Sequence, residues 1–208
     1  FNFDRAYRDI VQQLEFGPRA PGMSGHRQVR QWLIDELKDA GWQVETQSGT
    51  YRDKEVHNVI AYRQQGSAYL LMGAHYDTRL KADQDPVPEK RSKPVPGAND
   101  GASGVAVLLE LARSLPEPLD MPVRLVFFDA EDNGDLQGWD WIMGSSMYVK
   151  EMEQPPQAVV ILDMVGDKEL NLHLERSSTP DLQEEIWDIA HELGYESSFR
   201  PTLKYTIL

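Results

Sequence analysis

Three short apolar runs, each followed directly by acidic or histidine side chains, constrain the fold of this chain more than any other feature. The runs cover residues 69–74, 123–129 and 158–162, are rich in β-branched and aromatic residues, and are bounded by turn-forming residues. Runs of this length and composition predict buried strands. Because ligands of an open α/β sheet gather at the carboxyl ends of its strands, the sequence predicts that one edge of the sheet collects these polar side chains.

Segments with helical periodicity alternate with the strands. Residues 24–40, 103–115 and 181–193 place apolar side chains at three- and four-residue spacing, which is typical of helices that pack one face against a core. Further strand-like segments cover residues 44–46, 56–62 and 199–208. These helices and strands are compatible with the open α/β sheet to which the strand-end residues point.

Length and composition limit the classes of protein that remain. A chain of 208 residues is long enough for one large core, so we expect residues 1–208 to form a single domain. The formal net charge of -13 argues against nucleic acid as a partner, because a phosphate backbone is bound by clustered Lys and Arg side chains. The sequence has no cysteine, so any bound metal must be held by oxygen and nitrogen atoms.

Hydropathy and the first residue bear on location. No stretch of about eighteen consecutive apolar residues occurs, so the sequence predicts no membrane span. The first residue is Phe1 rather than Met, which favours a processed protein that has lost a leader and is secreted or periplasmic. A cytoplasmic location stays open.

The polar residues at the predicted strand ends are those that zinc prefers. His75 follows the first run, Asp132 the second and Asp163 the third, while Asp100 lies just before the helix at 103–115. Zinc accepts imidazole nitrogen and carboxylate oxygen, and two ions a few ångströms apart can share one carboxylate. We predict that Asp100 is the shared ligand. His75 and Asp163 would complete one site, and Asp132 would serve the other.

Two further carboxylates receive catalytic roles. Asp77 stands two residues after His75 and is predicted to hold the second ring nitrogen of that histidine, which would fix its tautomer. Adjacent side chains of an extended segment point to opposite sides, so Glu131 and Asp132 should not both bind the same ion. A free carboxylate beside the metal can act as a general base. We therefore assign the base to Glu131 and the ligand to Asp132.

Residues outside this group receive simpler interpretations. The segment 79–99 contains four prolines and lies between two predicted ligands, which indicates a rim or lid over the site; a solvated insertion is the alternative. His26, in the first turn of the helix at 24–40, is predicted to be a surface or capping residue. Neither Ser24 nor Ser145 lies in a nucleophile elbow, which argues against serine hydrolysis.

The motifs occur in the order found in a known family. They lie at residues 73–77, 96–104, 127–132, 144–145 and 162–166. Together they resemble the zinc-dependent aminopeptidases and their close relatives, the glutaminyl cyclases. The resemblance implies a three-layer α/β/α sandwich around a mixed, mostly parallel sheet, one or two zinc ions, and the site roles given above.

The chain also departs from the pattern of these families. Relatives usually carry two glutamates where this chain has Glu131 and Asp132, and they supply a last histidine ligand from a later segment. No histidine follows His191, so we expect that the C-terminal part of the fold lies outside residues 1–208. Relatives often have a cis peptide after the shared aspartate, which makes the bond between Asp100 and Gly101 a candidate for that geometry.

The resemblance implies an enzyme that recognises the N-terminal amine of a peptide, and two activities stay open. We favour an aminopeptidase that removes the N-terminal residue with metal-activated water, because the retained His75 and the motif around Asp100 suit two zinc ions. The alternative is a glutaminyl-peptide cyclotransferase, which forms N-terminal pyroglutamate with one zinc ion. Residues 133–143, with Trp139 and Trp141, are closer in length to the corresponding loop of the cyclases. A metal-free binding domain is a third alternative.

Overall fold

The computed structural model describes residues 1–66 and 68–204. The chain divides into two compact units, Phe1–Met164 and Val165–Leu208. All the residues predicted to form the site lie in the first unit. The expectation that residues 1–208 form a single domain stays a prediction.

The first unit is built on a five-stranded mixed sheet with the strand order β1-β2-β4-β3-β5. The strands are β1 Gln43–Tyr51, β2 Lys54–Tyr62, β3 Leu70–His75, β4 Val123–Phe128 and β5 Ala158–Ile161. β3 pairs in parallel with both β4 and β5, whereas β2 pairs antiparallel with β1 and β4. The sheet is mixed, as the resemblance implied, and its parallel part is formed by the three strands that precede the predicted site residues.

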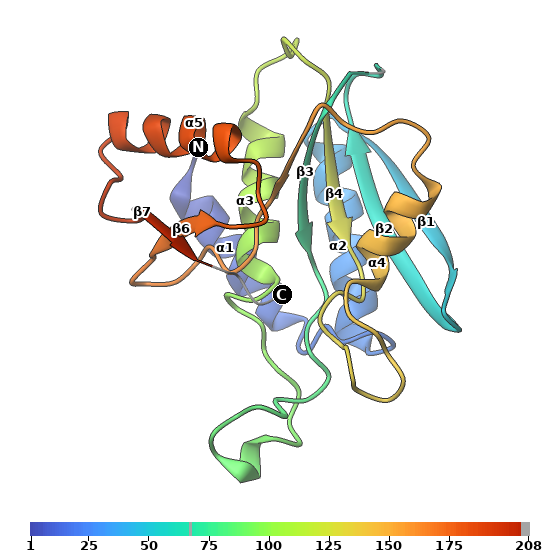
Figure 1. The fold of residues 1–208 in the computed structure, drawn as a ribbon. Coiled ribbons are helices and arrows are strands. Elements are labelled where there is room, and N and C mark those ends of the chain that lie inside the picture. The colour runs from blue at the N-terminus through green and yellow to red at the C-terminus, as the bar shows by residue number, and fades with distance from the viewer. Residues whose placement is uncertain (67, 205–208) are drawn as a thin grey trace. The chain divides into compact units, whose positions relative to one another are not determined.

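Helices cover both faces of this sheet (Figure 1). They are α1 Phe3–Glu15, α2 Ser24–Asp39, α3 Ala102–Ser114 and α4 Met143–Glu151. α2 and α3 pack on one face and α1 packs against α3, while α4 lies over β1 and β2 on the other face. The first unit therefore has the predicted three-layer α/β/α arrangement.

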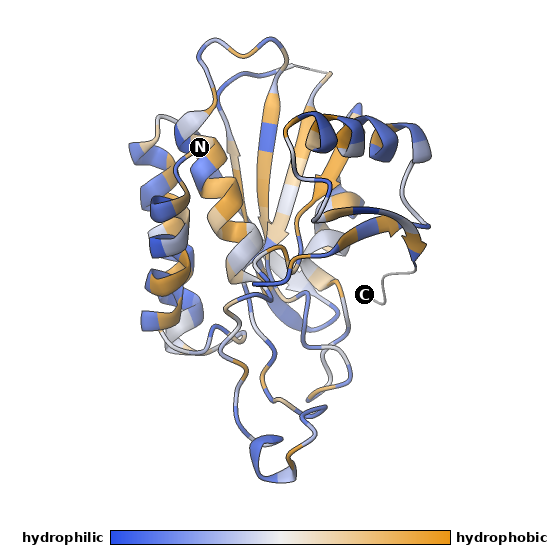
Figure 2. Cartoon of the chain, turned by 90° about the vertical axis from the view of Figure 1, so that its left-hand side faces the viewer, coloured by the Kyte–Doolittle hydropathy of each residue, from blue (hydrophilic) through white to orange (hydrophobic). Residues whose placement is uncertain are grey.

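The core explains why the central strand β4 is apolar from Leu125 to its end. Leu125 and Phe127 of β4 belong to the cluster under α2 and α3, whereas Val126 and Phe128 belong to the cluster on the face that carries α4. A strand that is buried on both faces has no position for an alternating polar residue. Figure 2 shows the apolar residues gathered in the strands of the sheet.

Sequence periodicity located most elements and missed others. The predicted helices at 24–40 and 103–115 are within one residue of α2 and α3 at each end. The predicted strand at 44–46 is too short, since β1 runs through polar residues to Tyr51 and turns into β2. α1 and α4 were not predicted. α4 begins at Met143, one residue before the motif at 144–145, whose glycine and serine were interpreted as a turn.

The second unit consists of a small parallel pair and a helix. β6 covers Leu172–Glu175, α5 covers Pro180–Glu192, and β7 covers Phe199–Lys204. The ring of Trp187 on α5 packs edge-on against Phe199, with 5.1 Å between the ring centroids. The predicted helix at 181–193 is confirmed, and the predicted strand at 199–208 is confirmed up to Lys204, its last four residues lying outside the described part. No helix in the described part of the chain is long and apolar enough to cross a membrane.

Close packing of α3 on the sheet gives a test of the fold. A Cβ atom on Gly104 would lie 2.2 Å from the carbonyl oxygen of Leu162 and 3.0 Å from Cβ of Ala74. The first distance is too short for a real Cβ contact and the second is unusually tight, so Gly104→Ala must push α3 away from Leu162 and Ala74. These two residues belong to segments that lead into the site. Overpacking of this kind costs about 1–3 kcal/mol of unfolding free energy, measurable by urea denaturation.

Gly49→Ala in β1 is the matched control. Its added Cβ would meet only Sδ of Met147, at an ordinary contact distance of 3.6 Å. We expect this variant to unfold within about 0.5 kcal/mol of the parent protein. Equal stability of both variants would mean that α3 does not pack on the strand ends as closely as described.

Candidate metal centre

The parallel register of the sheet brings three of the four predicted ligands together. His75 ends β3, Asp163 follows β5 by two residues, and Asp100 lies two residues before α3. Each of the three offers one ligand atom, and these atoms all lie within 4.8 Å of one another. Nε2 of His75 is 2.9 Å from Oδ1 of Asp100 and 3.5 Å from Oδ1 of Asp163. One imidazole nitrogen and two carboxylate oxygens at such separations suit a zinc ion.

The electrostatics of this group favour a cation. Burial lowers the pKa of His75, but the carboxylates of Asp100, Asp163 and Asp77 outweigh burial and leave this pKa well above its usual value. The hydrogen bond to His75 lowers the pKa of Asp163. The three carboxylates thus hold positive charge on the imidazole, and a metal ion would take the place of that proton.

Asp132 stands apart from the three-residue group. Burial, reinforced by the negative charges of Asp100 and Asp77, raises the pKa of Asp132 to about 7. A carboxyl group in such an environment is stabilised by any cation that approaches it. This arrangement fits the prediction that Asp132 serves a second position next to Asp100, and that role stays a prediction.

Glu131 is held by the start of α4. Its Oε1 accepts the backbone N–H of Ser145 at 2.6 Å and its Oε2 accepts the Ser145 hydroxyl at 2.8 Å. Burial raises the pKa of Glu131 to about 7 against the lowering effect of these bonds. A carboxylate with such a pKa can accept and return a proton near neutral pH. The role of Glu131 as general base stays a prediction.

The extended segment assumed for Glu131 and Asp132 is not present. β4 ends at Phe128, and Ala130 adopts a left-handed conformation with φ of 56°. The backbone turns there, and the N–H groups of Ile142 and Met143 donate to the carbonyls of Glu131 and Ala130 at 3.0 and 3.1 Å. Strand alternation therefore does not decide between Glu131 and Asp132, and both roles stay predictions.

Asp77 lies beside His75 and also makes contacts that were not predicted. Its Oδ1 lies 3.4 Å from Nδ1 of His75 without hydrogen-bond alignment, and its role in fixing that tautomer stays a prediction. The fully buried carboxylate accepts in addition the backbone N–H groups of Glu131 at 3.0 Å and of Asp132 at 3.4 Å, together with the side-chain amide of Asn133 at 3.0 Å. Asp77 thus holds the backbone that carries the predicted base and the predicted fourth ligand.

Arg19 is a buried anchor that sequence analysis missed. Its side chain is completely buried and donates to the carbonyl oxygens of Tyr76 at 3.2 Å, Pro96 at 2.9 Å and Gly97 at 2.6 Å. Burial lowers its pKa to about 10, so it stays charged at neutral pH. Arg19 joins the end of β3 to the segment that enters Asp100. Its only signal in the sequence is a charged residue between glycines and prolines.

His26 is buried rather than a surface or capping residue. Its Nε2 lies 2.6 Å from Oδ1 of Asp129, and its ring stacks on Tyr76 with 5.2 Å between centroids. The other oxygen of Asp129 accepts the backbone N–H of His57 at 2.8 Å. The prediction failed because helical position alone does not reveal that the first turn of α2 faces the end of β4.

Gly101 lies where the chain passes closest to the predicted ligands. Its φ is 85°, and an added Cβ would come within 2.8 Å of the Asp77 carbonyl oxygen. Both facts require glycine at this position. The cis bond expected between Asp100 and Gly101 is absent, and the cis bond found in the described part of the chain joins Glu117 and Pro118.

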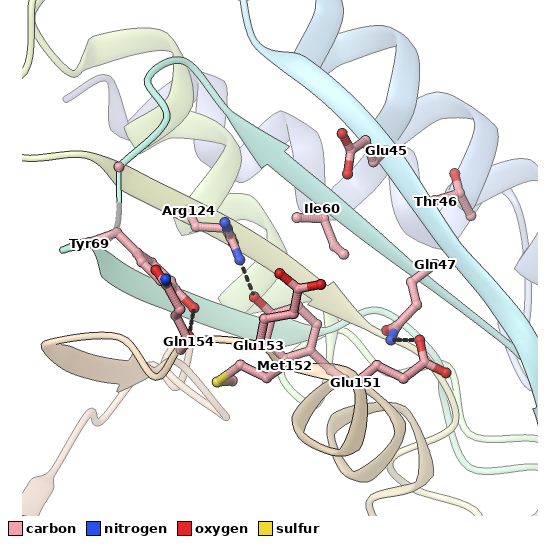
Figure 3. Close-up of a pocket in the computed structure, with 12 residues that line it drawn as sticks. Glu45, Thr46, Gln47, Ile60, Tyr69, Arg124, Glu151, Met152, Glu153 and Gln154 are labelled. Carbon is pink, nitrogen blue, oxygen red and sulfur yellow. Dashed lines mark hydrogen bonds between the residues drawn. The ribbon is translucent and has the colours of Figure 1, made fainter.

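An open hollow of about 380 Å³ lies elsewhere, on the face that carries α4 (Figure 3). Arg124 at the start of β4 projects into it, stacked on Tyr69 and bonded to the Tyr148 hydroxyl. β3 has six residues, so its two ends are about 20 Å apart. The hollow lies at the amino ends of β3 and β4, and it is therefore distinct from the group around His75.

Comparison with known proteins agrees with this architecture. The model of peptidase family M28 matches residues 58–206. The chain belongs to this family. The match includes the ends of β3, β4 and β5 and the segment that carries Asp100, so it covers every predicted site residue.

Individual relatives fall into two functional groups. A glutaminyl-peptide cyclotransferase-like protein of Bos taurus is 32% identical over 177 residues, which cover 71% of this chain and 44% of that protein. The crystal structure of Porphyromonas gingivalis glutaminyl cyclase has 34% identity and a TM-score of 0.91, covering 100% of this chain and 77% of that one. A Zn-dependent exopeptidase from Parabacteroides distasonis has 31% identity and a TM-score of 0.93, with coverage of 100% and 78%. The chain spans less than half the length of the curated relative.

Asp100 gives the sharpest test of the metal centre. Asp100→Asn removes a negative charge from the position next to His75 and Asp163, and we expect roughly tenfold or greater loss of zinc affinity. Elemental analysis after gel filtration would measure the loss. Asp140→Asn, an exposed carboxylate paired with Arg52, should keep the zinc content of the parent protein. Equal zinc content in the two variants would remove Asp100 from the ligands.

Proposed function

We propose that this protein is a zinc-dependent glutaminyl cyclase, which converts an N-terminal glutamine of a peptide into pyroglutamate. The observation that carries the proposal is the loop between Glu131 and Ser145. Residues 133–142 fold back beside Asp132, and their Trp141 lies against Arg79 with 4.7 Å between the guanidinium carbon and the ring centroid. A loop of this length with tryptophans resembles the cyclases, and the identity with cyclases over most of the chain supports the same activity.

Zinc would be held by the carboxylates of Asp100, Asp132 and Asp163 and by the imidazole of His75, as one ion or two. When bound there, zinc would polarise the side-chain amide of the substrate as a Lewis acid. The acidic groups that surround the position also attract the protonated amine of an incoming peptide. This attraction favours substrates with a free N-terminus.

Glu131 would move the proton that the reaction has to transfer. The α-amino nitrogen forms a bond to the side-chain amide carbon of the glutamine, and the bond from this carbon to the amide nitrogen breaks. The incoming ammonium first loses one proton to solvent, so that the neutral amine attacks. Glu131 then takes the proton that the attacking nitrogen loses as the new bond forms and delivers it to the amide nitrogen, which leaves as ammonia. A pKa of about 7 suits both halves of this transfer. Ser145 holds both carboxylate oxygens and so keeps the group oriented.

An aminopeptidase is the second candidate, favoured by one observation. His75, Asp100 and Asp163 could hold one ion without Asp132. Asp132 would then be available as a ligand of a second ion. In a two-ion site Glu131 would deprotonate water, and the water would attack the first peptide bond. The sequence alone favoured this activity; the likeness to cyclases shifts our choice.

The two activities give different products from one substrate. A peptide with N-terminal glutamine is incubated with the zinc-loaded protein and followed by mass spectrometry. We expect loss of ammonia from an otherwise intact peptide, faster than the spontaneous reaction in a control without protein. Release of free glutamine would instead identify the aminopeptidase. Unchanged peptide, together with an absence of bound zinc, would indicate the metal-free binding domain.

Glu131→Gln tests the base under either activity. Glutamine keeps an oxygen that can accept the Ser145 N–H but cannot take up a proton, so we expect turnover to fall at least about a hundredfold. Zinc content, measured on the same sample, should stay equal to that of the parent protein because Glu131 is not a ligand. Loss of zinc together with activity would exchange the roles of Glu131 and Asp132.

A further inference from the structure

Arg79 connects the two loops that border the candidate metal centre. Its side chain is 12% exposed. Nη1 donates to the carbonyl oxygen of Asp132 at 2.8 Å and to that of Gly134 at 3.2 Å. Nε and Nη2 donate to the two carboxylate oxygens of Asp83 at 2.6 and 2.9 Å. One guanidinium therefore binds both the segment after β4 and the segment after β3.

Arg79 lies at the base of the long segment that was expected to form a rim or lid. The backbone N–H of Val95 donates to the Arg79 carbonyl at 3.1 Å, and that of Ala82 donates to the Lys93 carbonyl at 2.8 Å. These bonds close a stem, beyond which the segment projects away from the sheet with the short helix at 88–90 (Figure 1). The position of the whole segment relative to Asp132 therefore depends on this stem.

Trp141 is seated by the same residue. The guanidinium carbon of Arg79 lies 4.7 Å from the centroid of its ring. The indole ring also packs against the backbone of Gly134, where an added Cβ would lie 2.2 Å from the ring. The indole N–H donates to Asp135 at 3.3 Å. The partly exposed ring is thus held beside Asp132, with one face against a cation.

Asn133 ties this assembly to the buried Asp77. Its amide nitrogen donates to Asp77 at 3.0 Å and to the Thr78 carbonyl at 3.1 Å, and its oxygen accepts the backbone N–H of Leu80 at 2.8 Å. Asp77 therefore binds the backbone N–H groups before Asn133, and Arg79 binds the carbonyl oxygens of Asp132 and Gly134. The backbone of Asp132 is thus held by both residues.

We propose that Arg79 is a positioning residue, whose guanidinium sets the backbone of Asp132 for metal binding and the ring of Trp141 for the substrate. Geometry matters more than charge here, because the fork makes four hydrogen bonds to three residues while its face stacks on the indole. A lysine ammonium has one donor centre and no planar face, so it cannot make this set of contacts. The proposal rests on the proposed function, in which Asp132 helps to hold zinc.

The test compares zinc affinity in Arg79→Ala and Arg79→Lys with that of the parent protein. Dissociation constants are measured by competition with a chromogenic chelator. We expect both variants to bind zinc roughly tenfold more weakly, because an outer contact that orients a ligand has been lost. Amide hydrogen exchange of the zinc-free protein should be faster at residues 132–136 in both. Parent-like affinity in Arg79→Ala, or full recovery in Arg79→Lys, would overturn the proposal.

Arg52→Ala is the matched control. Arg52 also forms an ion pair with this loop, through Asp140 at 2.7 Å, but it makes no contact with Asp132. Its removal should leave zinc affinity within twofold of the parent. Asp83→Asn provides a milder variant in case Arg79→Ala fails to fold. This variant weakens the contact between the Arg79 guanidinium and residue 83 but keeps the contacts with the carbonyl oxygens of Asp132 and Gly134. We therefore expect a smaller loss of zinc affinity than in Arg79→Ala. An unchanged zinc affinity would count against the proposal.

The same samples separate this proposal from the proposed function. If the parent protein binds zinc without cyclising a glutamine peptide, and Arg79→Ala weakens binding, then the cyclase activity is wrong and the role of Arg79 stands. If the parent cyclises the peptide and Arg79→Ala keeps full affinity, the role of Arg79 is wrong. A parent protein that binds no zinc would overturn both.

Discussion

The site depends on one buried carboxylate. Asp77 has no exposed surface, so its charge must be balanced by donors from the protein. The donors are the backbone N–H groups of Glu131 and Asp132 and the amide of Asn133. This interaction joins the end of β3 to the end of β4. Asp77 lies nearest to His75 in sequence among the side chains that join these two segments, ahead of Arg79.

The sheet supplies the other half of this constraint. Parallel pairing places His75 opposite Phe128 and Gly73 opposite Ile161, so β3 and β4 end at one level and β5 ends two residues earlier, just before Asp163. Arg19 then fixes the entry to Asp100 through three carbonyl groups. The result is an accumulation of carboxylates around a single imidazole, and burial and like charge raise the pKa of Asp132 to about 7. A zinc ion would relieve this accumulation, which is why the geometry and the charge of the site agree with the family.

A second constraint concerns how the loops reach the site. In the described part of the chain, the segment after β3 and the loop before α4 form no strand pair with each other, and Arg79 joins them. Its contacts combine two carbonyl oxygens, which any residue offers, with the carboxylate of Asp83 and the indole of Trp141, which only these side chains supply. The coupling of the two loops therefore depends on the fold and on these residues together.

The sequence by itself determined the α/β alternation, the strands that carry the site, and the identity of His75, Asp100 and Asp163 as a group. Apolar periodicity and residue chemistry are local, and a ligand set at strand ends follows from them. The tertiary structure alone decided the contacts of Asp77, the burial of His26 and Arg19, and the turn at Ala130 that precedes Glu131 and Asp132. Each of these depends on which carbonyl, amide or carboxylate a distant segment brings near, and such long-range pairings leave no periodic signal in the chain.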